Sequence, residues 1–137
     1  MHTTDIESYI PQRPPILMVD AFDCEGEGGC TSSLLVREEN IFLDDGGRMM
    51  AEGLLEHIAQ TAAAYVGYCR KMAGDEVNLG YIGDIKRCSV GTHMPSVGKT
   101  VCTSLKVVSQ VGNITMVAAE STSDGETLIS CRMKLAN

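Results

Sequence analysis

Three polar side chains with four-residue spacing are the first candidates for chemistry in this sequence. They lie in the stretch 48–70, which is rich in Leu, Ala, Met and Glu and has no proline, so it predicts a helix. Glu52, Glu56 and Gln60 recur every four residues and therefore share one side of that helix. A carboxylate buried on such a helix costs several kcal/mol unless it is paired or used. Glu56 is therefore either a catalytic carboxylate or a buried acid held by Gln60 and backbone groups.

The rest of this helix is apolar on nearly every side, which indicates a buried helix. Small residues from Thr61 to Ala64 would let a sheet approach its backbone closely. The loop Asp44–Gly47 precedes the helix, and we expect its carboxylates to cap the helix and suit its positive end. Gly74 and the two acidic residues after it are expected to close the helix.

Strand patterns flank this helix on both sides. The predicted strands lie at residues 16–22, 30–37, 79–90, 99–110, 113–121 and 127–135. The last alternates apolar and polar side chains, which is typical of an antiparallel strand with one buried face. Gly112-Asn113 and Asp124-Gly125 mark two tight turns. The order predicts an α+β fold, in which an antiparallel sheet of about six strands wraps around one long central helix of roughly 34 Å.

Composition limits the classes of function. The chain has 137 residues, and we expect one domain over residues 1–137. A net charge of −7 argues against a nucleic-acid surface, which needs a basic stripe. No apolar run approaches the roughly 18 residues of a membrane span. The first eight residues have neither a basic start nor an apolar signal segment, so we expect a cytoplasmic protein that acts without a membrane.

The six cysteines do not indicate a metal site. They are scattered without a C-x-x-C pair, and no histidine stands at ligand spacing from a cysteine or another histidine. Without an export signal, they are interpreted as reduced and mostly buried thiols. We therefore expect no metal and no cofactor.

Four segments resemble one family, the hot-dog 3-hydroxyacyl-acyl-carrier-protein dehydratases. The segment 9–20, Tyr-Ile-Pro-Gln-Arg-Pro-Pro-Ile-Leu-Met-Val-Asp, resembles the opening motif of the family, and 55–61, Leu-Glu-His-Ile-Ala-Gln-Thr, resembles its helix motif. Residues 83–87 and 90–98 look like its third strand and Pro-Gly turn. The spacing from Phe42-Leu-Asp44 to Glu56 is similar to that in dehydratase-like proteins of aryl-polyene and flexirubin pigment clusters. The resemblance implies a hot-dog fold that assembles as a dimer.

The resemblance also implies a mechanism. In the family, a histidine of the opening motif removes the C2 proton of an acyl thioester, and the helix carboxylate protonates the departing 3-hydroxyl. Amides at the start of the helix polarise the thioester carbonyl. Glu56 matches the carboxylate, but Gln12 stands where the family has its histidine, and Met50-Ala51 replaces a Pro-Gly pair. A glutamine amide orients a carbonyl or a water and cannot act as the base, whose loss typically costs about 10² to 10⁴-fold.

Other polar side chains have secondary roles in this hypothesis. Glu52 lies near the helix start, where a carboxylate stabilises the dipole, and Gln60 orients its neighbours. Arg13 is a candidate docking residue, expected to lie close to the mouth of a tunnel for the acyl chain. His57 lies about 100° around the helix from Glu56 and is expected to face the sheet or a dimer partner, whereas His93 lies in the more exposed loop before Pro95.

Three functions remain open at this point. The first is a 3-hydroxyacyl thioester dehydratase-like enzyme of fatty-acid, polyketide or pigment synthesis, with the substrate carried on acyl carrier protein or coenzyme A. The second is a thioesterase that uses Glu56 alone as base or nucleophile. The third, which Gln12 favours, is a non-catalytic subunit that binds acyl carrier protein or completes the site of an active hot-dog partner. The dimer is accordingly a homodimer or a pair of different hot-dog subunits.

Overall fold

The computed structural model describes residues 1–26, 28–74 and 81–136, and in these ranges it has one α-helix and one seven-stranded antiparallel sheet. The helix α1 runs from Ala51 to Met72, and a short 3-10 turn, η1, covers Ile6–Ser8. The strands are β1 (His2–Thr3), β2 (Ala21–Asp23), β3 (Gly29–Leu35), β4 (Tyr81–Val90), β5 (Thr100–Val111), β6 (Ile114–Ser123) and β7 (Glu126–Ala136). They lie in the order β1-β2-β3-β5-β6-β7-β4.

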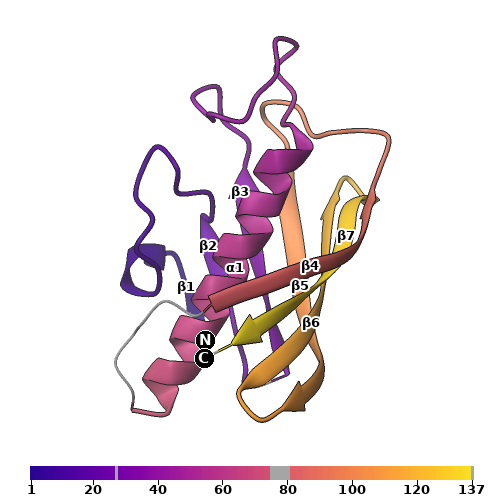
Figure 1. Ribbon diagram of the computed structural model, residues 1–137. Coiled ribbons are helices and arrows are strands. Elements are labelled where there is room, and N and C mark those ends of the chain that lie inside the picture. Colours follow the sequence, from indigo (N-terminus) through magenta and orange to yellow (C-terminus); the bar gives the residue numbers. More distant parts are fainter. Residues whose placement is uncertain (27, 75–80, 137) are drawn as a thin grey trace.

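The sheet curls around the helix (Figure 1). α1 contacts β3, β4, β5, β6 and β7, and β4 crosses in front of the helix in this view while β3, β5 and β6 pass behind it. Leu54, Ile58 and Ala62 on the covered side of α1 are fully buried. The predicted α+β arrangement of a sheet around one long helix is confirmed, and β1 accounts for the strand beyond the expected six.

The helix begins at Ala51, three residues later than the helix-prone stretch. Its N-cap residue, Met50, makes no side-chain capping hydrogen bond. The expected capping by the preceding loop was wrong, because Asp44 caps its own loop. Its Oδ1 accepts the backbone N–H groups of Gly46 at 2.8 Å and Arg48 at 3.0 Å. The first-turn amides of α1 are thus left without a side-chain cap.

The predicted end of the helix is confirmed at Gly74. This residue follows the C-cap Ala73 and has φ of 84°, a left-handed conformation that glycine adopts without steric cost. The expected closing residues Asp75 and Glu76, and the first two residues of the predicted strand 79–90, lie outside the described residues.

Two hairpins connect the last three strands, as the sequence predicts. Val111 is opposite Ile114 at the first turn, and Ser123 is opposite Glu126 at the second. Asp124 and Gly125 have φ of 51° and 78°. Two consecutive left-handed residues form the tight turn that matches the twist of antiparallel strands.

The predicted strand 16–22 was wrong over most of its length, since β2 covers Ala21–Asp23 alone. The backbone of the preceding residues is instead bound by side chains of α1. The amide of Met18 donates to Gln60 Oε1 at 2.7 Å, and the carbonyl of Met18 accepts from His57 Nδ1 at 2.6 Å. These long-range bonds replace the strand pairing that the apolar sequence of this segment favours.

A chain of buried polar side chains links α1 to the sheet. Its five members are at most 5% exposed: Ser32, His57, Thr61, Thr103 and Ser121. Because His57 Nδ1 donates to a carbonyl, Nε2 of the neutral ring is the acceptor and receives the Thr103 hydroxyl at 2.9 Å. The Thr103 oxygen in turn accepts from Ser121 at 2.6 Å.

The second branch of this chain runs through β3. The Thr61 hydroxyl donates to the carbonyl of His57 at 2.9 Å, and its oxygen lies 2.7 Å from the hydroxyl of Ser32. The polar chain therefore connects the helix with β3, β5 and β6. Desolvation by burial lowers the pKa of His57, against smaller opposing effects of its bond to Met18 and of the Asp20 charge.

We predict that Thr103→Val lowers the free energy of unfolding by about 1–3 kcal/mol, because it leaves His57 Nε2 and the Ser121 hydroxyl without their partner. Urea titration measures the change. The matched control is Thr100→Val, which changes an exposed residue on the same strand and is expected to stay within about 0.5 kcal/mol of the wild type. Equal effects of the two substitutions would contradict a stabilising role of the polar chain.

We also predict that stability falls as the pH drops below about 6.5. The folded protein resists protonation of His57, whereas the unfolded chain takes up that proton near the ordinary pKa, so acid favours unfolding. The loss from this single group is at most about 1.4 kcal/mol per pH unit. Unfolding free energies at pH 7.5 and 5.5 for the wild type and His57→Asn measure it. The asparagine variant should show a smaller loss, and an identical loss would refute the assignment.

Candidate active site

The carboxylate of Glu56 is held by Gln60 on the side of α1 that the sheet leaves uncovered. This side consists of exposed or half-buried residues at three- and four-residue steps: Ala51, Glu52, Leu55, Glu56, Ala59 and Ala63. The Gln60 amide nitrogen donates to Glu56 Oε1 at 2.9 Å. One oxygen of the carboxylate is thus fixed, and the group faces outward along the helix.

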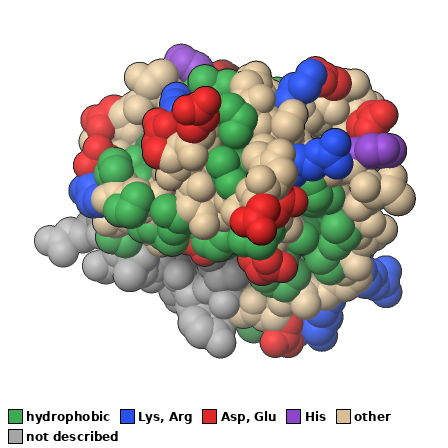
Figure 2. Space-filling model, turned by 90° about the horizontal axis from the view of Figure 1, so that it is seen from above, with side chains coloured by type: hydrophobic (Ala, Val, Ile, Leu, Met, Phe, Trp, Pro, Cys, Tyr) green, Lys and Arg blue, Asp and Glu red, His purple; other side chains and the backbone are tan. Residues whose placement is uncertain are grey.

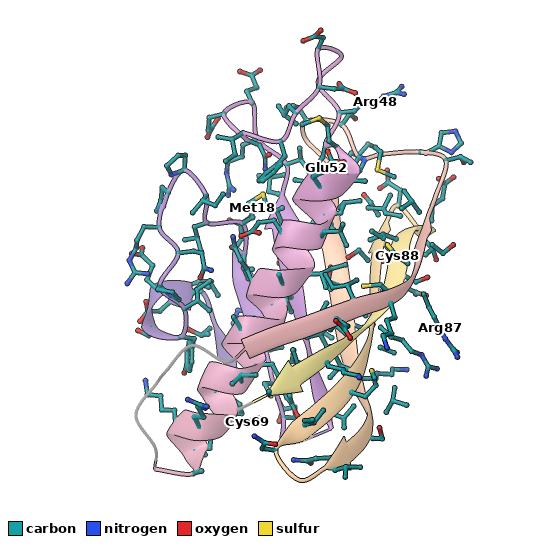
Figure 3. All side chains as sticks on the ribbon, in the orientation of Figure 1. Met18, Arg48, Glu52, Cys69, Arg87 and Cys88 are labelled. Atoms are coloured by element: carbon teal, nitrogen blue, oxygen red, sulfur yellow. The ribbon has the colours of Figure 1, made fainter. Side chains whose placement is uncertain are left out.

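Gln60 itself is buried, and its amide is fully used. Besides Glu56, its nitrogen donates to the carbonyl of Ile16 at 2.8 Å, and its oxygen accepts the amide of Met18. These three bonds fix the rotation of the amide and tie the segment 16–18 to the helix beside Glu56. Figure 3 shows Met18 next to the middle of α1 and Glu52 at its upper end. Gln60 therefore positions both the carboxylate and the chain that follows Gln12.

Gln12 lies in a segment whose backbone is held by hydrogen bonds from Arg13. The Arg13 guanidinium donates to the carbonyls of Ile10 at 2.8 Å and Gln12 at 2.9 Å, and it forms an ion pair of 2.6 Å with Glu7. The side-chain oxygen of Gln12 is buried and has no hydrogen-bond partner. Leaving a buried acceptor unsatisfied costs about 1–3 kcal/mol.

The histidines lie apart from Glu56. His57 faces the sheet, inside the polar chain described above. His93 is exposed, with Nδ1 3.1 Å from the Thr92 hydroxyl and 3.8 Å from a carboxylate oxygen of Glu126. His2 contacts Asp23 at 2.7 Å. The structure thus brings Glu56 and Gln60 together, and it places His57 and His93 elsewhere.

The remaining predicted residues lie at the start of α1. Ala51 is its first residue and is half buried, and Glu52 is exposed in its first turn. The carboxylate of Glu52 suits the positive end of the helix dipole. Arg13 lies in the earlier segment, where its half-exposed side chain contacts Glu7 and backbone carbonyls, and its docking role stays a prediction.

Sequence reasoning missed the hydroxyl partners of His57. Thr103 stands between the buried Val101 and Leu105 on the inner face of β5. A hydroxyl residue inside an apolar row of a strand is the signal that points to a buried polar partner.

Two kinds of feature are absent from the described residues. No group of three or more His, Cys, Asp and Glu side chains among them is placed to hold a metal ion. Within the same ranges, no helix combines the length and apolar character needed to cross a membrane.

Comparisons with known proteins place the chain in a family. The family model described as ApeP-like, ApeP dehydratase, matches residues 4–137. The chain belongs to the ApeP-like dehydratase family. No match to the sequence is found among curated proteins.

Solved structures share the fold at low identity. The dehydratase heterocomplex ApeI:P from Xenorhabdus doucetiae superposes with a TM-score of 0.85 at 15% identity, covering 96% of this chain and 90% of that chain. The E. coli PaaI protein from the phenylacetic acid degradation operon gives 0.66 at 13% identity, with 85% and 82% covered. A hypothetical thioesterase from Streptococcus pneumoniae, solved with coenzyme A, gives 0.65 at 12% identity, with 84% and 86% covered. The hot-dog fold implied by the sequence motifs is thereby confirmed.

We predict that Gln60→Leu lowers the free energy of unfolding by about 1–3 kcal/mol, because the amide of Met18 and the carbonyl of Ile16 lose their partner inside the protein. Hydrogen exchange of the Met18 amide should accelerate in the same variant. The matched control is Gln110→Leu, at an exposed position of β5. Unchanged exchange at Met18 would show that Gln60 does not hold this segment.

Proposed function

We propose that this protein is a dehydratase-type subunit that acts on 3-hydroxyacyl thioesters and completes its active site against a second hot-dog subunit. Glu56 is the acid that protonates the departing 3-hydroxyl. The observation that carries the proposal is the Glu56–Gln60 pair on the uncovered side of α1, in a chain of the ApeP-like dehydratase family.

The need for a second subunit follows from the chemistry. Elimination of water requires one group that removes the C2 proton and another that protonates the hydroxyl. Among the described residues, no histidine side chain is hydrogen-bonded to Glu56, and the His57 ring is buried and bonded to Met18 and Thr103. In this proposal the proton-removing group comes from the partner, and the site contains one reactive carboxylate from each copy of this chain.

Gln12 has an orienting role in this scheme. Its buried side-chain oxygen has no hydrogen-bond partner in the single chain. Buried polar groups are normally hydrogen-bonded, so we expect the assembled complex to supply a donor. A donor from the partner or from the bound substrate meets this need. The uncapped amides at the start of α1 support the polarisation of the thioester carbonyl.

The surface around the site supports association with another subunit. Strand β4 is paired on one side, by β7, and residues 84–90 are all exposed. Figure 2 looks onto the end where α1 begins and shows apolar groups separated by acidic side chains. Large exposed apolar residues in the surrounding segments are Ile41, Met50, Ile85, Val90 and Val97. An open sheet edge beside exposed apolar side chains is a typical protein-binding surface.

Two forms of hot-dog partner are open: a second copy of this chain, which has Gln12 at the same position and brings no histidine there, or a homologue that carries the missing base. The similarity to one heterocomplex of dehydratases supports the second form. The acyl chain is carried as a thioester on acyl carrier protein or coenzyme A. The thioester carbonyl makes the C2 proton acidic enough to be removed, which the chemistry of the family requires. Glu56 is only half buried in the single chain, which supports access by such a substrate.

We predict that the purified chain alone turns over a short 3-hydroxyacyl thioester slowly and that Gln12→His raises this rate. The gain should be about 10²-fold or more, since a positioned base typically contributes about 10² to 10⁴-fold. Formation of the enoyl thioester is followed by its ultraviolet absorbance. Copurification from the native source tests for a partner that bears the histidine.

The control variants separate the proposal from its alternatives. Glu56→Gln should abolish activity, while Glu39→Gln, at an exposed loop position, should keep it. Release of free thiol that depends on Glu56 would identify a thioesterase and reject the dehydratase. Full activity of the purified wild-type homodimer would reject the requirement for a different partner.

A further inference from the structure

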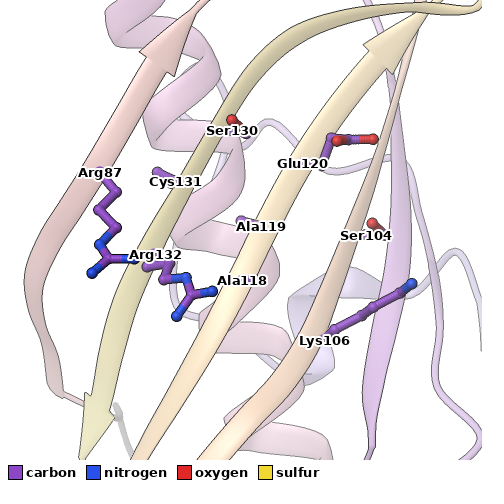
Figure 4. A pocket seen from close by; sticks show the side chains of 9 residues that line it. All are labelled: Arg87, Ser104, Lys106, Ala118, Ala119, Glu120, Ser130, Cys131 and Arg132. Atoms are coloured by element: carbon purple, nitrogen blue, oxygen red, sulfur yellow. The ribbon is translucent and has the colours of Figure 1, made fainter.

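The outer face of the sheet, opposite α1, has a hollow of about 300 Å³ formed by β4, β5, β6 and β7 (Figure 4). The strand register determines which side chains lie at the base of this hollow. Lys106 on β5 is opposite Ala118 on β6, and Ala118 is opposite Arg132 on β7. The backbone positions of these two cationic residues therefore lie about 10 Å apart, two strand spacings, with the methyl group of Ala118 between them.

A bulge in β4 adds a third cation. Lys86 is opposite Arg132 and Ser89 is opposite Ser130, so two residues of β4 face one residue of β7 in between. Arg87 lies in this bulge with φ of 51°, a left-handed conformation that is unfavourable for a residue with a side chain. Bulges re-aim side chains, and Figure 4 shows Arg87 and Arg132 extending over the same part of the sheet.

These cations lack counter-charges. Among the described residues, no carboxylate lies within ion-pair distance of Arg87, Arg132 or Lys106. Glu120 lines the same hollow without pairing with any of them. In a protein of net charge −7, three unpaired cations around one hollow are a local excess of positive charge. Neighbouring like charges repel, and a bound anion would relieve that repulsion.

We propose that this hollow binds the phosphate group of a small phosphorylated molecule. Guanidinium groups match phosphate with two parallel hydrogen bonds, and a pair of them suits a doubly charged anion. Lys106 extends to the other side of the hollow and adds positive charge there (Figure 4). The hydroxyls of Ser104 and Ser130 line the hollow as further donors. Its volume lies at the lower end of the range for small-molecule pockets, about 300–1,000 Å³.

This site is separate from Glu56. Along β5, Thr103 and Leu105 are buried toward α1, while Ser104 and Lys106 alternate to the opposite face. The hollow and the candidate active site are therefore on the two faces of one sheet. Binding of phosphate can be tested without any thioester substrate, and its outcome does not depend on the proposed dehydration.

Isothermal titration calorimetry at pH 8 and constant ionic strength tests the proposal with two probes, inorganic phosphate and phenyl phosphate. Both are largely doubly charged at this pH. We expect saturable binding of phenyl phosphate, weakened at least about tenfold by Arg87→Gln and by Arg132→Gln.

Glu120→Gln should tighten the binding of phenyl phosphate, because it removes the negative charge from the hollow. The matched control Arg48→Gln, in the exposed loop at another part of the molecule (Figure 3), should leave binding unchanged.

The probes and variants separate the possible outcomes. Tighter binding of phenyl phosphate than of inorganic phosphate supports a phosphorylated organic ligand, and equal binding supports free phosphate. Absence of saturable binding to both, or equal weakening by Arg48→Gln, would overturn the proposal. Binding of poly-glutamate but of neither phosphate compound would also overturn it and would assign the arginines to an acidic protein surface. Arg132→Gln decides the test if Arg87→Gln does not fold, because Arg132 is an exposed residue of a regular strand.

Discussion

The structure depends on the hydrogen bonds that two helix side chains make to the backbone of residues 16–18. Gln60 and His57 together satisfy the amide of Met18, its carbonyl and the carbonyl of Ile16. These bonds join segments about 40 residues apart in sequence. They prevent the segment from becoming a strand, and they fix its position along α1. The location of Gln12, a few residues earlier in the same segment, follows from this attachment.

His57 and Glu56, which lie within one turn of α1, have different chemical environments. His57 is enclosed by hydroxyl groups between helix and sheet, where burial lowers the pKa of its ring. Glu56, its neighbour in sequence, lies about 100° around the helix and faces away from the sheet. Two side chains that are adjacent in sequence therefore lie in different surroundings. His57 is hydrogen-bonded to Thr103 of the sheet, and Glu56 is hydrogen-bonded to Gln60.

Much of the fold could be predicted because it depends on local patterns. The helix follows from its composition and spacing, and the hairpins follow from Asp124-Gly125 and Gly112-Asn113. The segment 16–22 could not be predicted in the same way, since its apolar sequence favours a strand and long-range bonds override that preference. For the site, the spacing of Glu56 and Gln60 predicted their pairing. The hydroxyl partners of His57 and the row Lys106–Ala118–Arg132 depend on strand register, which a single sequence does not define.

The two ends of the sheet differ in a way that limits the size of any assembly built through it. β4 has ten residues and an open backbone edge, whereas β1 at the opposite end has two. If two β4 edges paired around a twofold axis, both long edges would be covered. The edges left exposed would be the two β1 strands, which are too short to pair with a further strand. Growth by edge addition then terminates at two subunits. In an assembly paired in this way, the unequal ends would prevent open-ended polymerisation.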